Sequence, residues 1–305
     1  MSRAGIDWRA WWQLLRAANV FTAMSNVIAG FLLVQRDWQP LGPLLLLILS
    51  SVCLYEAGMV LNDVFDAELD AVERPERPIP SGRISKENAY WVGLVLLGGG
   101  NIAALFASVT IGQYLPIMFA IALSWKIWSY NAWEKSTSWG PLAMSTCRGL
   151  NVLLGASIAT SLVGGVIMAG FLVGGVCFHT YGLTLISRSE AGSLKHIELT
   201  TGIGVVIAGL AWIAALPFTI GDLGIPVVAW FGVCILLLII ELLLARQLLT
   251  NPSQSCIRQT VGTLILMFIP LDAAASALAA GWSAGFCVLL LLLPVRLLSR
   301  WTGQT

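Results

Sequence analysis

Long apolar segments, separated by short polar connections, recur along the whole of this 305-residue chain. A helix that crosses a membrane needs about 20 consecutive apolar residues, and these segments are roughly 18 to 22 residues long. Hydrophobic residues make up 57% of the chain and charged residues 11%, with a mean hydropathy of +0.83, which is more apolar than the core of a water-soluble protein requires. The pattern predicts an all-α, polytopic membrane bundle.

Ten apolar segments are candidate membrane-spanning helices, so we expect nine or ten spans. They lie near residues 17–34, 42–62, 90–110, 113–130, 139–160, 164–185, 199–219, 224–247, 260–280 and 282–299. The first segment follows three arginines and has no small-residue cleavage site, which indicates a retained helix rather than a signal peptide. The chain is therefore expected to be one transmembrane domain over residues 1–305.

Lysine and arginine gather in alternate connections. They precede the first segment and follow the second, fourth, sixth, eighth and tenth, whereas the other connections contain only Arg36. The positive-inside rule then predicts cytoplasmic long loops and, with ten helices in a bacterial-type inner membrane, two cytoplasmic termini. Ionisable residues near 63–88, 131–138 and 187–198 would surround a cavity open to that side. The net charge of +1 is uninformative about nucleic acid, and no nucleic-acid partner is expected.

Four acids lie within eight positions just after the second apolar segment. If that helix continues, Asn62, Asp63, Asp66 and Asp70 project from one face. Carboxylates this close in low-dielectric surroundings take up protons or bind cations, and oxygen ligands of this kind suit Mg²⁺. The spacing predicts a magnesium site made of these four residues; a solvated acidic loop that caps a helix is the alternative.

An arginine- and proline-rich segment follows the acids. Prolines at 75, 78 and 80 exclude a regular helix and favour an ordered turn, while Arg74, Arg77 and Arg83 offer forked donors suited to phosphate oxygens. Acids beside these arginines indicate a bound anion bridged by a cation. The alternative is that these arginines only set the orientation of the loop in the membrane and form local ion pairs.

The pattern Asn62-Asp63-x-x-Asp66-x-x-x-Asp70, followed by Arg-Pro-x-Arg-Pro-x-Pro-Ser-Gly, resembles the first signature of the UbiA superfamily of intramembrane prenyltransferases. The first apolar segment, with Arg16, Asn19, Phe21 and Asn26, resembles the polar pattern of the family's first helix. Tyr130 and Lys135 resemble the family's Tyr-x-x-x-Lys loop, with one extra residue between them. The resemblance covers about residues 10 to 250.

The resemblance implies a membrane enzyme that transfers a prenyl group from a prenyl diphosphate to a small aromatic or lipophilic acceptor, assisted by Mg²⁺. It implies that Asn62, Asp66 and Asp70 hold the metal ion, with Asp63 either a ligand or a group behind the ligands. Asp66, Asp70, Lys135 and Tyr130 are the implied catalytic residues. The implied diphosphate-binding residues are Arg16, Arg77, Lys126 and Lys135.

The segment after the sixth helix departs from the family pattern, which commonly has a second motif of the form Asp-x-x-x-Asp. Residues 179–193 contain no aspartate, so we hypothesise a single-metal site in which Arg188 or Lys195 supplies the missing cationic charge to the diphosphate. Ser-Arg-Ser-Glu at 187–190, with Arg148 and Asn151, resembles the EboC branch of the family. That branch is encoded in bacterial and algal gene clusters for the handling or export of secondary metabolites, which implies partners from such a cluster.

Further polar residues within the apolar segments are candidates for the substrate cavity. Arg148 and Asn151 share a helix face, and Arg148 is too costly to face lipid, so it is expected to line the cavity or to form a structural ion pair. Glu56 is either a base for the acceptor or a buried protonated acid. The remaining candidates are Asn19, Asn26 and Glu190. The altered second motif leaves an alternative function: an inactive UbiA-like protein that binds, or helps to export, an isoprenoid or secondary metabolite.

Overall fold

The computed structural model of the protein describes residues 7–159, 162–191 and 196–302, and all its regular elements there are helices. In chain order they are α1 (Trp8–Leu15), α2 (Val20–Gln35), α3 (Leu41–Phe65), α4 (Ala67–Glu73), α5 (Lys86–Ile111), α6 (Leu115–Ala132), η1 (Glu134–Ser136), α7 (Gly140–Ala156), α8 (Leu162–Ala191), α9 (His196–Ala214), η2 (Leu216–Phe218), α10 (Val227–Thr250), α11 (Gln254–Leu266), α12 (Phe268–Ala280), α13 (Trp282–Leu289) and α14 (Leu292–Thr302). The prediction of an all-helical membrane bundle is confirmed.

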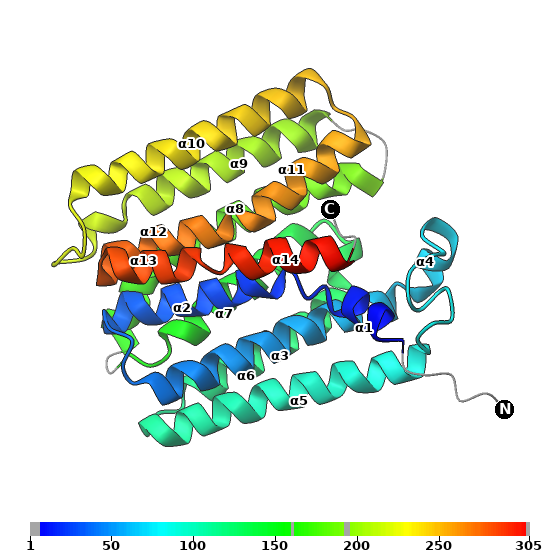
Figure 1. Ribbon diagram of the computed structural model, residues 1–305, viewed down its shortest axis with the longest axis horizontal. Helices are drawn as coiled ribbons and strands as arrows, with labels where there is room; N and C mark the ends of the chain where they lie inside the picture. Colours follow the sequence, from blue (N-terminus) through cyan, green and yellow to red (C-terminus); the bar gives the residue numbers. More distant parts are fainter. Residues whose placement is uncertain (1–6, 160–161, 192–195, 303–305) are drawn as a thin grey trace.

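The long helices lie side by side with nearly parallel axes, so their connections gather at the two ends of the bundle (Figure 1). The helices α1 and α4 lie toward one end, at the right in Figure 1. This is the end that carries the arginine- and lysine-rich connections. The assignment of this end of the bundle to the cytoplasm remains a prediction. The single domain over residues 1–305 also remains a prediction.

Six stretches of the described residues are long and apolar enough to cross a membrane: α3, α5, α8, α9, α10, and α11 with α12. A seventh is formed if α1 and α2, which meet at a bend of 44°, count as one span. Each predicted apolar segment does coincide with a helix or a pair of helices. The predicted number of nine or ten spans is nevertheless not confirmed, because the other helices are shorter or more polar.

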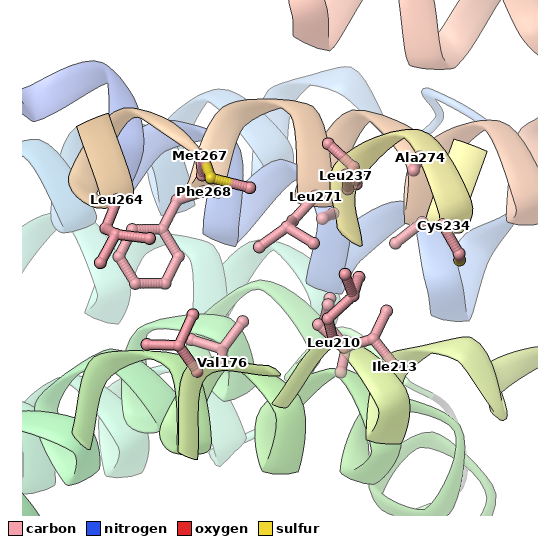
Figure 2. Packing of buried hydrophobic residues seen from close by; sticks show 14 of the residues in the cluster. Val176, Leu210, Ile213, Cys234, Leu237, Leu264, Met267, Phe268, Leu271 and Ala274 are labelled. Atoms are coloured by element: carbon pink, nitrogen blue, oxygen red, sulfur yellow. The ribbon is translucent and has the colours of Figure 1, made fainter. Parts of the chain in front are cut away.

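The largest core of buried residues joins the second half of the bundle. Figure 2 shows Val176 of α8 and Leu210 of α9 facing Leu264 and Leu271 from α11 and α12, with Leu237 of α10 beside them. Lipid tails are as apolar as leucine, so close packing rather than transfer out of water holds such helices together. This core fixes α8 and α11, which both contribute to the cavity described below.

Paired glycines bring α2 and α7 together. A methyl group on Gly155 of α7 would overlap the carbonyl oxygen of Val27, and one on Gly30 of α2 would overlap the backbone of α7. Only glycine permits this approach, which resembles the close helix crossings of other membrane proteins. It places Asn26 of α2 within hydrogen-bond distance of Arg148 on α7.

Two helix breaks shape the end of the bundle that carries the acidic motif. Arg16 ends α1 in the left-handed region, at φ 47°, which is uncommon for a residue other than glycine. Asp66 separates α3 from α4 with φ −87° and ψ 0°, so the second helix does not continue unbroken through the acidic motif. Both breaks lie against the same cavity.

Candidate active site

A cavity of about 480 Å³ opens among the helices α3, α4, α6, α7, α8 and α11 and the junction of α1 with α2. Nine residues that the sequence predicted as site residues line it: Arg16, Asn19, Asn62, Asp66, Asp70, Arg77, Tyr130, Arg148 and Asn151. We call the part formed by Arg16, Asn62, Asp66, Asp70, Arg74 and Arg77 the mouth, and the part formed by Tyr55, Arg148 and Asn151 the inner end.

The acidic motif divides its side chains between the cavity and the protein interior. Asn62, Asp66 and Asp70 line the cavity, whereas Asp63 does not and is only 5% exposed. The break at Asp66 keeps the hydrogen-bond ladder, since Asp66 N–H donates to the Asn62 carbonyl at 3.0 Å and Asp70 N–H to that of Asp66 at 2.8 Å. Three of the four predicted metal ligands therefore face one space.

Each aspartate of the motif is paired with a cation. Asp63 Oδ1 accepts from Arg16 Nη2 at 3.3 Å and from Arg77 Nη1 at 3.4 Å. Arg77 Nη1 also donates to Asp70 Oδ2 at 2.6 Å, and Lys135 Nζ lies 2.5 Å from Asp66 Oδ1. Such charge-assisted contacts are stronger than neutral hydrogen bonds and fix the arginine side chains at the mouth.

The proline-rich segment holds Arg77 in place through a small apolar core. Ile79 and Ile84 are buried there with residues of α1, α3 and α5. The Ile84 N–H donates to the Pro78 carbonyl at 3.1 Å, and Arg83 Nη2 to that of Glu76 at 2.8 Å. The ordered turn predicted from the prolines is present, and it presents Arg77 inward while Arg83 stays at the surface.

The donor set at the mouth fits Mg²⁺. Two carboxylates and one amide oxygen, from Asp66, Asp70 and Asn62, are hard oxygen donors on one surface. Mg²⁺ keeps several waters and commonly takes one or two carboxylates together with substrate phosphates. The described residues contain no group of three His, Cys, Asp or Glu side chains arranged to hold a metal by themselves, so such an ion would depend on phosphate oxygens to complete its coordination.

The two lysines predicted to bind diphosphate differ in position. Lys135, in η1, does not line the cavity itself, but its Nζ pairs with Asp66, which does. Lys126, on α6, pairs with Glu134 at 2.9 Å and is not among the residues that line the cavity. Tyr130 lines the cavity from the same helix. Lys126 is thus placed to hold the loop that carries Lys135 rather than to face the cavity.

The segment that replaces the second aspartate motif presents hydroxyl groups. Thr180, Thr184 and Ser187 of α8 line the cavity. Arg188 instead donates from Nη2 to the Thr137 carbonyl, which ties the end of α8 to the connection before α7. The side chain of Glu190, and Lys195, lie outside the described residues.

The inner end is a buried polar network that sequence reasoning found only in part. Arg148 donates to Asn26 Oδ1 at 3.0 Å, and Asn26 Nδ2 donates to Asp272 Oδ2 at 2.7 Å. Asn151 accepts from Ser51 at 2.7 Å and donates to the Ala23 carbonyl at 2.9 Å, so its amide is used in packing. Asn26 does not line the cavity.

Other placements could not be predicted from the motifs. Glu56 is 7% exposed, does not line the cavity, and its Oε2 has no hydrogen-bond partner in the described part of the chain. Tyr55 lines the cavity but was absent from the predicted site, whereas Arg74, which lines it too, was predicted as a donor to phosphate oxygens. Thr22 and Ser25, which share a face of α2 with Asn26, extend the inner network, and their helical spacing is the signal that could have indicated them.

Several known proteins resemble this chain. A digeranylgeranylglyceryl phosphate synthase from Methanothermobacter thermautotrophicus is 30% identical over 192 residues, which are 61% of this chain and 60% of the relative. One from Saccharolobus solfataricus is 29% identical over 147 residues, 48% of this chain and 51% of the relative. One from Methanococcus aeolicus is 28% identical over 261 residues, which cover 79% of this chain and 87% of the relative. The chain thus spans about half the length of the first two relatives.

Solved structures share the fold. A UbiA homologue from Archaeoglobus fulgidus bound to GPP and Mg²⁺ matches with a TM-score of 0.63 at 12% identity, covering 92% of this chain and 99% of the homologue. A structure described for digeranylgeranylglyceryl phosphate synthase matches with a TM-score of 0.65 at 20% identity, covering 90% of this chain and 98% of that one. The model of the UbiA prenyltransferase family matches residues 23–269. This protein is a multi-pass membrane protein that belongs to the UbiA prenyltransferase family.

Proposed function

We propose that the protein transfers a prenyl group from a prenyl diphosphate to a small aromatic or lipophilic acceptor, with Mg²⁺ as cofactor. The observation that carries the proposal is the arrangement of paired carboxylates and cations at the mouth of an otherwise largely apolar cavity. A diphosphate needs the cations, and a magnesium ion needs the carboxylates. The relatives named as digeranylgeranylglyceryl phosphate synthases and the homologue bound to GPP and Mg²⁺ support this assignment.

At the mouth, Arg16 and Arg77 would bind and orient the diphosphate, and Lys135, paired with Asp66, would add a further cation. Asn62, Asp66 and Asp70 would hold Mg²⁺, and the bound ion would supply positive charge to the pyrophosphate. Fixed donors aimed at developing charge stabilise the transition state in this way. Arg74 lines the same space and adds a further cation to the predicted set.

The transfer itself breaks the bond between the allylic carbon and the diphosphate oxygen. The electron pair leaves with pyrophosphate, the acceptor's nucleophilic atom forms the new carbon bond, and that atom loses a proton, which the released pyrophosphate can take up. Leu54, Met59, Leu123, Ile127 and Ile265 line the cavity and would cover the isoprenoid chain. Tyr130 is close to the mouth and would present its ring or hydroxyl to the reacting carbon.

We propose Arg188 and Lys195 as replacements for the second aspartate motif. Arg188 lies beside η1 through its contact with Thr137 and directly follows Ser187, which lines the cavity. At saturating Mg²⁺, Arg188→Ala or Lys195→Ala is expected to lower turnover by at least about tenfold. Losses smaller than that in both variants contradict the replacement.

The alternative is a protein that binds or exports its ligand without catalysis, and the absence of aspartate after the sixth predicted helix favours it. One experiment distinguishes this alternative from the enzyme. Purified protein is incubated with labelled dimethylallyl, geranyl, farnesyl and geranylgeranyl diphosphates and candidate acceptors, with and without Mg²⁺. Pyrophosphate release that requires Mg²⁺ and is lost in Asp66→Ala is expected. Glu68→Ala is the matched control, because Glu68 lies in the same motif with its side chain fully exposed.

If no donor releases pyrophosphate with any acceptor, the proposed enzymatic function is wrong and the alternative of a binding or export protein is retained. The relation to the EboC branch, a secondary-metabolite substrate and partners from a shared gene cluster remain parts of this proposal. Product analysis with acceptors of different chemistry addresses the substrate. Co-purification from cells that express the neighbouring genes addresses the partners.

A further inference from the structure

The hydroxyl groups with which α8 lines the cavity form a row along one face of the helix. Thr180, Thr184 and Ser187 line the cavity and follow one another at helical spacing, so they share a face. They span about 10 Å of the helix at 1.5 Å per residue. We call these three residues the hydroxyl row.

One end of the hydroxyl row lies near the mouth of the cavity. Ser187 is followed by Arg188, which donates to the carbonyl of Thr137, the residue after η1. The helix η1 carries Lys135, whose Nζ pairs with Asp66 at the mouth. A prenyl diphosphate held at the mouth would therefore carry its allylic carbons inward past this end of the row.

The other end of the row lies near the inner end of the cavity. Thr180 follows His179, whose ring lies edge-on to Phe268 at 4.9 Å between the ring centres. The centre of the same Phe268 ring lies 4.6 Å from the guanidinium carbon of Arg148. The row thus runs through the part of the cavity between its two ends.

The hydrogen atom of each hydroxyl in the row is already donated within α8. Thr180 Oγ1 donates to the Val176 carbonyl and Thr184 Oγ1 to the Thr180 carbonyl, both at 2.7 Å. Ser187 Oγ donates to the Thr184 carbonyl at 2.9 Å. A carbonyl oxygen can only accept, so each hydroxyl is the donor and keeps only its lone pairs for the cavity. The row presents partial negative charge there.

Thr22 of α2 shows what a hydroxyl in this state binds. Its Oγ1 donates to the Asn19 carbonyl at 2.7 Å and accepts from the guanidinium of Arg148 at 2.9 Å. The lone pairs of such a hydroxyl are thus used by a positive group in this same protein. Lone pairs attract positive charge and repel phosphate oxygens, so the row is unsuited to holding a diphosphate directly.

We infer that the hydroxyl row stabilises the positive charge that develops on the prenyl group as pyrophosphate leaves. The inference rests on the proposed prenyl transfer and assigns three further catalytic residues to it. The charge is shared by two carbons of the allylic group, so hydroxyls at successive turns of α8 can act on it together. Leu183 and Ile265 line the same cavity, and in such apolar surroundings fixed dipoles act more strongly than in water.

Binding of a cationic analogue tests the inference apart from turnover. The full-length protein in lipid nanodiscs is titrated calorimetrically in the presence of Mg²⁺ and without an acceptor. One ligand is an aza analogue of geranyl diphosphate, whose protonated tertiary nitrogen replaces the substituted allylic carbon. The other is its saturated carbon isostere, which is uncharged there and cannot ionise. The aza analogue is expected to bind at least about tenfold more tightly, the size of one charge-assisted hydrogen bond. Equal affinities overturn the inference.

Substitutions then assign the preference to the row. Thr184→Val, which keeps the shape and removes the hydroxyl, is expected to reduce the preference at least about threefold, and Thr184→Ser to keep it. The double variant Thr184→Val/Ser187→Ala is expected to abolish it. Thr110→Val is the matched control, because Thr110 Oγ1 makes the same bond, to the Phe106 carbonyl at 2.7 Å, on the exposed face of α5. A preference that the double variant retains in full contradicts the inference.

Affinity for the saturated isostere verifies that each variant is folded. If Thr184→Val does not fold, Ser187→Ala alone is measured in its place, with the same expected reduction. In steady-state pyrophosphate release, the folded variants are expected to lower kcat about three- to tenfold with an unchanged KM for the donor, because the charge develops only as the bond breaks. A raised KM with an unchanged kcat contradicts the inference.

The outcomes separate the two proposals. Pyrophosphate release by a wild-type protein that does not prefer the aza analogue overturns the role of the row and leaves the prenyl transfer. A preference that depends on the row, without release from any donor, overturns the prenyl transfer and leaves a surface of the cavity that attracts cations.

Discussion

Asp63 offers the sharpest test of how the mouth of the cavity works. The sequence left it either a metal ligand or a group behind the ligands, and in the structure its Oδ1 accepts from both Arg16 and Arg77 while the side chain stays out of the cavity. We therefore expect Asp63 to position the two arginines for the diphosphate. The substitution Asp63→Asn keeps the shape and removes the charge.

The magnitude follows from those two contacts. A hydrogen bond to a charged group contributes about 1.5 to 3 kcal/mol and a neutral one about 0.5 to 1.5 kcal/mol, so the substitution loses about 1 kcal/mol per contact. The contacts are long, at 3.3 and 3.4 Å, and the Arg16 side chain is 31% exposed, so solvent screening reduces the total. About 1 to 2 kcal/mol remains, which corresponds to about 5- to 30-fold weaker binding of the prenyl diphosphate.

The assay is steady-state pyrophosphate release with the donor and Mg²⁺ varied independently. We expect Asp63→Asn to raise the KM for the donor by this factor with little change in the Mg²⁺ concentration at half-saturation. Asp66→Asn is expected to raise the Mg²⁺ concentration at half-saturation. Substitution of the exposed Glu68 in Glu68→Gln is expected to change neither that concentration nor the KM for the donor. The reasoning is refuted if excess Mg²⁺ restores the wild-type KM for the donor in Asp63→Asn, because a variant of a metal ligand behaves in that way.

Three further results are expected. Lys135→Gln lowers pyrophosphate release by at least about tenfold because it removes the cation paired with Asp66, whereas Lys126→Gln, which removes the partner of Glu134, lowers it by less than about threefold; similar losses in the same release assay contradict this difference between their partners. Gly155→Val overlaps the Val27 carbonyl and costs about 1 to 3 kcal/mol by overpacking, so the unfolding temperature in detergent falls by several degrees, while Gly98→Ala, which has open space around it, leaves the temperature unchanged. EDTA abolishes release, and excess Mg²⁺ restores it without a change in helix content by circular dichroism; a loss of helix content instead assigns the ion a structural role.

The sequence predicted the fold because membrane helices are specified locally. Each apolar run must satisfy its own backbone hydrogen bonds, so length and composition locate the helices without knowledge of their neighbours. The same argument cannot place the break at Asp66 or count the spans, because these depend on how helices such as α6 and α13 pack and on where the bilayer lies.

The site was predictable where its residues are close in the chain. Asn62, Asp66 and Asp70 follow helical spacing and do face one cavity. Contacts between distant residues carry no such pattern: Ser25 and Asn26 bind Asp272 across nearly the whole chain, and Lys126 turns to Glu134 because η1 folds back toward α6. Sequence patterning indicated that Arg148 faces the cavity or a partner, but only the packed helices identify Asn26 and Thr22 as its partners.

The two ends of the cavity differ in how their charges are matched. At the mouth, Asp66 is paired with Lys135 and Asp70 with Arg77, so a ligand that brings only one sign of charge leaves an ion behind without its partner. Arg16 is paired with Asp63, which lies behind the cavity lining. At the inner end, Arg148 donates to Asn26 and Thr22, and Asn26 links it to the buried carboxylate of Asp272. A diphosphate with its magnesium ion would bring both signs of charge and could take up cations and carboxylates together, so the mouth is the end of the cavity that suits it.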